Sequence, residues 1–228
     1  LAAILRVIVI LLTLITTWYF AEKMYSNRDN MKSLRSIFVK SGSIYFLEKK
    51  KAQFSCGNEK PCPDDYFAFK IISGAANVVG PSMCFENSII MSSIKNNIGR
   101  GLNIALINGK NGLVLCVKDV DFFLKSLRDV KPLLEFIKPV AEGTLVFVAS
   151  YDDPGTKLND EARAVFASFG SSYSKKIGFR DSWLFVGGKG ISTKSPFEQH
   201  IKNNKETNKY DGWPEVLEME GCIPKKTN

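Results

Sequence analysis

The sequence predicts a mixed α+β fold, in which the strands form two packed sheets flanked by short helices. Three observations lead to this expectation. Residues 66–72 alternate in the manner of a half-buried strand and are closed by Ser73-Gly74. Asparagine and glycine at 108–112 separate two short apolar runs, which is the pattern of a β-hairpin. Beyond residue 120, apolar residues at helical spacing alternate with further strand-like runs.

The expected strands occupy the middle of the chain. Asn108 and Gly112 bound the predicted hairpin turn, because asparagine and glycine tolerate the positive φ that such turns require. Short apolar runs bounded by turn residues, such as 145–150, indicate buried strands. In chain order we expect strands at residues 66–72, 83–92, 102–107, 113–117, 145–150 and 182–186.

Two segments have the spacing of helices. In the first, apolar residues recur at Phe122, Phe123, Leu127, Val130, Leu133, Leu134 and Ile137. In the second, Asn159 is placed to cap the helix, while Asp160 and Glu161 favour its positive N-terminus. Gly170 then ends this helix. Residues from 191 onward are polar and basic, and no helix or strand is assigned to them.

Residues 7–21 form an almost uninterrupted apolar run behind Arg6. The run is shorter than the ~20 residues that a spanning helix needs, and a preceding positive residue is typical of a secretory signal. We therefore interpret residues 1–21 as a signal peptide and expect a secreted protein. The sequence Tyr19-Phe20-Ala21 lacks small residues at both cleavage positions, so an uncleaved signal-anchor in the Golgi lumen is the alternative. We interpret residues 22–55 as a linker or propeptide-like segment and residues 56–228 as the globular domain.

Five cysteines follow the apolar run: Cys56, Cys62, Cys84, Cys116 and Cys222. In an oxidising compartment four of them could form two bridges, which leaves one over. The chain has no Cys-x-x-Cys spacing and a single histidine, His200, so we expect no metal site. The glycine-rich stretch 74–80 lacks the Walker motif of a phosphate-binding loop and the Gly-x-Gly of a dinucleotide site. We therefore expect no cofactor.

The net charge of +8 is spread over the chain, with lysine clusters at 49–51, 175–176 and 225–226. A solvated surface accounts for most of this charge, and weak binding of polyanions is the functional interpretation. An export signal argues against nucleic acid as a partner. Contact with a membrane is expected only through an uncleaved leader.

Several motifs are spread over roughly residues 56–224. They are Ser73-Gly74-Ala75-Ala76-Asn77-Val78-Val79-Gly80-Pro81, Asn97-Ile98-Gly99-Arg100-Gly101-Leu102-Asn103-Ile104-Ala105, Tyr151-Asp152-Asp153-Pro154-Gly155-Thr156-Lys157, Phe179-Arg180-Asp181-Ser182-Trp183, Gly212-Trp213-Pro214-Glu215 and Glu218-Met219-Glu220-Gly221-Cys222-Ile223-Pro224. Through these motifs, which are highly specific jointly, the chain resembles the family with sequence similarity 3, the interleukin-like epithelial–mesenchymal transition inducer type.

This resemblance implies a compact β-β-α domain, with two facing antiparallel sheets and helices outside. It implies two disulfides, Cys56 to Cys84 and Cys62 to Cys222, and an unpaired Cys116. The implied function is that of a cytokine-like secreted factor that binds a cell-surface receptor. The chain departs from the family in the longer segment Val120 to Asp129, and at Val186, where one branch carries an extra cysteine.

Such a fold also resembles the sugar-binding stem domain of protein O-mannose N-acetylglucosaminyltransferase. In that domain an arginine of a Gly-Arg-Gly motif, an aspartate at a strand end and an arginine before Asp-x-Trp contact the sugar. The matching positions are Arg100, Asp153 and Arg180, so the resemblance implies a carbohydrate-binding pocket there. The competing interpretation is an internal salt-bridge cluster that holds this region together without a ligand.

Other functional patterns are weaker. Asp152 and Asp153 could serve a glycosidase, but adjacent strand residues point to opposite faces. No Gly-x-Ser-x-Gly elbow accompanies His200, so we do not expect an enzyme. We expect Trp183 and Cys116 to be buried, and a sugar-stacking role for Trp213 is left open. Three functions thus compete: a receptor-binding signalling protein, a Golgi or extracellular glycan-binding module, and a hydrolase.

Overall fold

The computed structural model describes residues 6, 10–20, 22–23, 54–121, 130–191 and 193–226. The chain divides into two compact units, residues 1–50 and 51–228. In the first unit, residues 10–20 are helical and their side chains are exposed. None of the described helices combines the length and the apolar character needed to cross a membrane. Parts of the expected leader and residues 24–53 of the expected linker lie outside the described residues.

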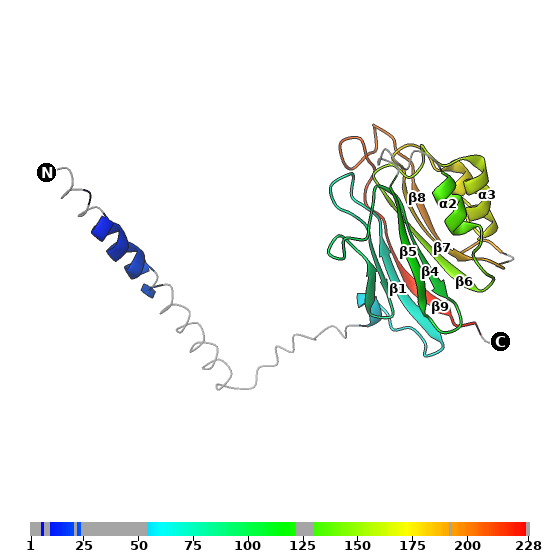
Figure 1. Cartoon of the computed structure of the whole chain (residues 1–228), viewed down its shortest axis with the longest axis horizontal. Coiled ribbons are helices and arrows are strands. Elements are labelled where there is room, and N and C mark those ends of the chain that lie inside the picture. The colour runs from blue at the N-terminus through cyan, green and yellow to red at the C-terminus, as the bar shows by residue number, and fades with distance from the viewer. Residues whose placement is uncertain are drawn as a thin grey trace. The chain divides into compact units, whose positions relative to one another are not determined.

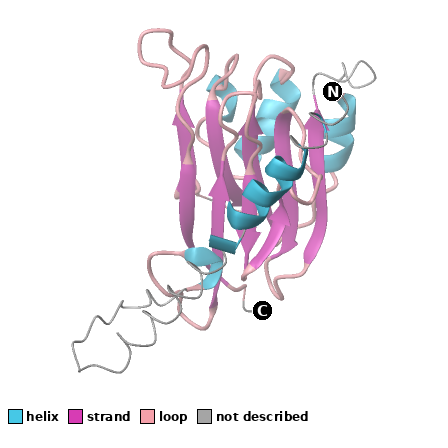
Figure 2. Ribbon diagram, turned by 90° about the vertical axis from the view of Figure 1, so that its left-hand side faces the viewer, coloured by secondary structure: helices cyan, strands magenta, loops and turns pink. Residues whose placement is uncertain are grey.

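Two antiparallel sheets build the second unit (Figures 1 and 2). The four-stranded sheet has the order β3-β2-β1-β9 and comprises β1 (Tyr66–Ile72), β2 (Ser82–Phe85), β3 (Ser88–Met91) and β9 (Glu218–Pro224). The five-stranded sheet has the order β5-β4-β6-β7-β8 and comprises β4 (Gly101–Asn108), β5 (Val114–Asp121), β6 (Thr144–Tyr151), β7 (Ser182–Gly188) and β8 (Phe197–Ile201). The remaining elements are α2 (Lys131–Ile137), α3 (Asp160–Ser168) and the short 3₁₀ helices η1 (Ser55–Gly57) and η3 (Ser174–Lys176).

The central strands of the five-stranded sheet, β4, β6 and β7, are buried on both faces, because they lie between the helices and the other sheet. Along β4, β6 and β7, one set of side chains packs on α2 and α3, for example Ile104, Val148 and Trp183. The alternate residues of the same strands, for example Phe147 and Leu184, pack on the four-stranded sheet. This period of two produces two separate cores. The α+β class and the β-β-α layering are confirmed.

Most local expectations hold. Gly112 donates its backbone N–H to the Asn108 carbonyl (2.9 Å) at a positive φ, as the hairpin requires. The Asn159 side chain accepts from the backbone N–H of Ala162 (2.9 Å) and caps α3. Gly170 follows the helix at φ +98°. Of the first expected helix, residues 131–137 form α2, while residues 122–129, most of the divergent segment, lie outside the described residues.

Two local expectations were incomplete. The run 83–92, expected as strand, is a hairpin of β2 and β3, because Glu86 and Asn87 adopt positive φ and turn the chain. The polar tail also contributes two strands, β8 and β9, to which no element was assigned. Their pairing with β7 and β1 makes them strands, and their own sequences are too polar to signal it.

The disulfides are those that the resemblance implied. Cys56 is bonded to Cys84 and Cys62 to Cys222. Cys116 is the free cysteine, but its predicted burial was wrong, because it is exposed. Its strand, β5, is an edge of the five-stranded sheet, where a side chain can lack a covering layer.

A candidate ligand site at the loop end of the sandwich

The three residues expected to bind a sugar come together at one end of the five-stranded sheet. Arg100 precedes β4, Asp153 follows β6 and Arg180 lies two residues before β7. Because β4, β6 and β7 are antiparallel neighbours, the start of β4, the end of β6 and the start of β7 meet at the same edge. The register pairs Gly101 with Tyr151 and so brings Arg100 close to the acidic pair. We call this region the loop end.

At the centre of the loop end is Asp152, which the sequence pointed to less than its neighbour. Its Oδ2 lies 3.8 Å from Arg100 Nε. Its Oδ1 accepts a hydrogen bond from Trp213 Nε1 (3.1 Å). The Arg180 guanidinium stacks over the Trp213 ring, 3.8 Å from the ring centroid, and lies 4.8 Å from that of Phe179. The buried Asp152 carboxylate thus pairs directly with Arg100. It is linked to Arg180 only through the indole ring of Trp213.

Burial raises the pKa of Asp152 above its ordinary value. The hydrogen bond from Trp213 and the positive charges of Arg100 and Arg180 oppose this rise, and the neighbouring charge of Asp153 adds to it. The net direction means that the loop end does not fully compensate a negative charge at this position.

Asp153 has a different role, although it adjoins Asp152 in the sequence. Its Oδ1 accepts from the backbone N–H groups of Gly155 and Thr156, each at 3.1 Å, and of Arg180 at 3.3 Å. The carboxylate therefore binds the backbone of Arg180 and ties two turns together. Gly155 lies so close to Gly178 that a Cβ at Gly155 would meet the Gly178 carbonyl oxygen at 2.0 Å.

A third carboxylate, that of Asp181, is buried at the same end and holds the turn before β7. It accepts from His200 Nε2 and from the backbone N–H groups of Gly178 and Asn203, each at 2.8 Å. Burial opposes ionisation of Asp181, but these hydrogen bonds, led by that of His200, outweigh it and lower the pKa. The His200 ring also packs against Tyr173. The hydrogen bond between His200 and Asp181 therefore joins the tail to the turn before β7, and its role is structural.

The remaining sequence candidates are placed as follows. Trp183 is fully buried against Phe166 and Phe185, as expected for a core residue. Trp213 is half-buried and belongs to the loop end through Asp152 and Arg180. Among the described residues, no group of three or more histidine, cysteine or acidic side chains is arranged to hold a metal ion.

Comparison with known proteins identifies the family. Residues 100–191 match the family model described as "Interleukin-like EMT inducer". The chain is 53% identical to human Protein FAM3D over 226 residues, which cover 99% of this chain and 98% of that protein. It is 50% identical to human Protein FAM3C over 97% of this chain and 96% of that protein, and 47% identical to human Protein FAM3A over 100% and 98%. With this identity over nearly its whole length, the chain belongs to the FAM3 family of cytokine-like proteins.

Proposed function

We propose that this FAM3 protein is a secreted, cytokine-like signalling protein that acts by binding a cell-surface receptor. The observation that carries the proposal is its identity of about half to three FAM3 proteins, together with the interleukin-like description of the matching family model. Its described residues also form a small domain closed by two disulfides, which suits an oxidising extracellular setting. Retention in the Golgi lumen is the alternative location.

The loop end is the surface that we propose for the receptor. Tyr151, next to Asp152, hydrogen-bonds the carbonyl of Asn77 and so joins the 73–81 loop to this end. That loop exposes Val78 (79%) and Val79 (59%), and the neighbouring 92–100 loop exposes Ile94 (99%). Exposed aliphatic side chains beside arginines and a tryptophan have the composition of an interface hot spot. A partner that covers these exposed apolar side chains removes them from water, which favours binding at this surface.

The receptor proposal predicts the effect of making these tips polar. A Val79→Ser and Ile94→Ser double variant should bind responsive cells at least about tenfold more weakly, because hot-spot side chains contribute about 2 kcal/mol or more each. The measurement is saturable cell binding of the labelled full chain. Leu115→Ser, which alters an exposed apolar residue on β5, is the matched control and should bind as the wild type. Equal binding by the double variant would remove the loop end as the receptor surface.

The same residues support a second candidate, a glycan site. Arg100 and Arg180 carry guanidinium donors for sugar hydroxyls, and the Trp213 ring, on which Arg180 stacks, adds aromatic surface beside them. Asp153 holds the backbone of Arg180 in place. As a Golgi or extracellular module, the protein would then act by carbohydrate binding, with or without a receptor.

Arg180→Lys distinguishes a glycan site from a structural cluster. Lysine keeps the charge and loses the planar fork, so binding on a glycan array should fall while the melting temperature changes little. The matched control is Lys175→Arg, an exchange of the same two residue types at an exposed lysine outside the loop end, which should leave glycan binding unchanged. A wild type that binds no glycan, with a variant that melts much lower, would show that the cluster is structural.

We further propose that the protein is not an enzyme. The three FAM3 proteins named above bear no enzyme names, and the hydrogen bonds of Asp153, Asp181 and His200 all serve turns and loops. Turnover of an ester, peptide or glycoside that Asp153→Asn abolished would restore the hydrolase interpretation. Polyanion binding by the basic surface should be weak and should be lost at high salt.

A further inference from the structure

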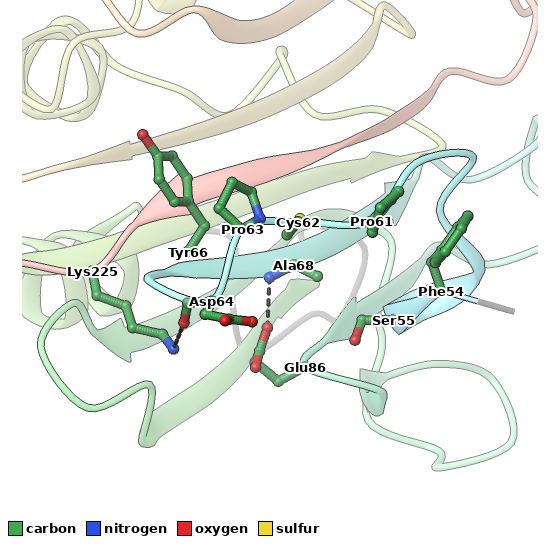
Figure 3. Close-up of a pocket in the computed structure, with 10 residues that line it drawn as sticks. All are labelled: Phe54, Ser55, Pro61, Cys62, Pro63, Asp64, Tyr66, Ala68, Glu86 and Lys225. Carbon is green, nitrogen blue, oxygen red and sulfur yellow. Dashed lines mark hydrogen bonds between the residues drawn. The ribbon is translucent and has the colours of Figure 1, made fainter. Parts of the chain in front are cut away.

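A cavity of about 390 Å³ lies at the other end of the four-stranded sheet, where β1 begins. This volume is within the range of ligand pockets in proteins. Its walls include Phe54, Pro61, Pro63, Asp64, Tyr66 and Glu86 (Figure 3). The loop end follows the opposite terminus of β1, so the cavity is a separate site and is independent of the proposed function.

Two carboxylates of the cavity, those of Asp64 and Glu86, point toward one another (Figure 3). Glu86 Oε1 accepts the backbone N–H of Ala68 at 2.5 Å, and the Glu86 N–H donates to the Ala68 carbonyl at 3.0 Å. These bonds hold the Glu86 carboxylate at the rim. Neither carboxylate takes part in any ion pair found among residues 54–121, 130–191 and 193–226. A cation bound in this cavity would be attracted by both negative charges.

The lysine that borders the cavity is engaged elsewhere. Lys225 Nζ donates to the backbone carbonyl of Asp64 at 2.7 Å and lies 5.2 Å from the centroid of the Phe67 ring. The lining residues include two acids, Asp64 and Glu86, and one base, Lys225, so their net charge is one negative unit. On a chain of net charge +8, this cavity is a local negative site.

Asp64 and Glu86 are both exposed, and the walls around them limit which groups can reach both carboxylates. The Cys62–Cys222 disulfide anchors the segment between Pro61 and Pro63 to β9, and proline restricts its backbone further. Phe54 and Tyr66 add aromatic surface. A guanidinium group pairs with carboxylates through a planar fork and also stacks on aromatic rings, and its aliphatic stem suits an apolar wall. We propose that the cavity binds an arginine side chain presented by a peptide segment of a protein partner.

The experiment titrates the ¹⁵N-labelled full chain with N-acetyl-arginine methylamide. The amide signal of Ala68, whose N–H is held by Glu86, should move saturably, and added salt should weaken the binding. Glu86→Gln keeps a side-chain acceptor for this N–H but removes the charge, and should weaken binding at least about tenfold. The neutral isostere N-acetyl-citrulline methylamide should cause no saturable shift. Equal binding of the two probes would overturn the proposal.

A second pair of variants keeps the test valid if Glu86→Gln disturbs the hairpin turn. Asp64 uses its backbone carbonyl, and not its carboxylate, to bind Lys225, so Asp64→Asn leaves that contact intact. Asp64→Asn should weaken arginine binding, whereas Asp65→Asn, at an exposed acid that does not line the cavity, should not. Equal weakening by both variants would indicate a long-range charge effect and would also overturn the proposal.

Discussion

Removal of the Cys62–Cys222 disulfide by paired serine substitutions should lower the free energy of unfolding by about 5 kcal/mol. A bridge restricts the unfolded chain more as the enclosed loop grows, and this one joins cysteines 160 residues apart. It also fastens the segment before β1 to β9, which pairs with β1 along its whole length. The Cys56–Cys84 bridge spans 28 residues, and its loss should cost about 3.5 kcal/mol by the same relation.

Urea denaturation followed by circular dichroism measures both losses. Cys116→Ser is the matched control, because this exposed thiol forms no disulfide, and it should change the free energy of unfolding by less than about 0.5 kcal/mol. If the two bridge variants unfolded at the same urea concentration as Cys116→Ser, loop closure would not be a source of stability in this domain.

Substitution of Trp183 by alanine should destabilise the domain by about 3 to 5 kcal/mol. Its indole ring is fully buried between β7 and the helical layer, and its Nε1 donates to Glu198 Oε1 at 3.0 Å. The change removes a large apolar side chain, leaves a cavity and takes one donor from a carboxylate that also binds Ser171 and the backbone of Ser172. A side chain placed for sugar stacking would cost much less.

Trp183→Phe separates packing from the hydrogen bond. Phenylalanine retains most of the ring contact with Phe166 and should recover more than half of the loss, while the Glu198 contact stays broken. The measurement is again denaturant unfolding, now compared with Trp213→Phe at the half-buried loop end. A Trp183→Ala variant as stable as Trp213→Phe would contradict the core assignment.

The elements that the sequence predicted well are those with local signals. The alternation of residues 66–72, the Asn and Gly of the 108–112 turn and the Asn159 cap each act within a few residues of the backbone. The elements that it missed depend on distant partners. The strand β8 is half-buried throughout and forms by pairing with β7, while β9 completes the sheet beside β1 from the far end of the chain.

At the loop end, too, the sequence indicated some side chains, whereas the position of others depends on distant partners. The motifs pointed to Arg100, Asp153 and Arg180, and the antiparallel order of β4, β6 and β7 brings all three to one edge. Asp152, which pairs with Arg100, could have been found from the adjacent acidic pair, but not its orientation. Its φ of +59° turns the carboxylate toward Trp213, 61 residues away, and no local pattern encodes that contact.

Local signals in the sequence were enough to predict the α+β class and those strands and the helix cap that carry such signals, and the motifs indicated the family and both disulfides. The pairing of Asp152 with Arg100, the exposure of Cys116 and the cavity shared by Asp64 and Glu86 are visible only in the folded domain. Backbone preferences and capping act over a few residues, whereas side-chain pairing, edge position and cavities arise when sheets bring distant segments together, and their geometry is set by packing of the whole domain.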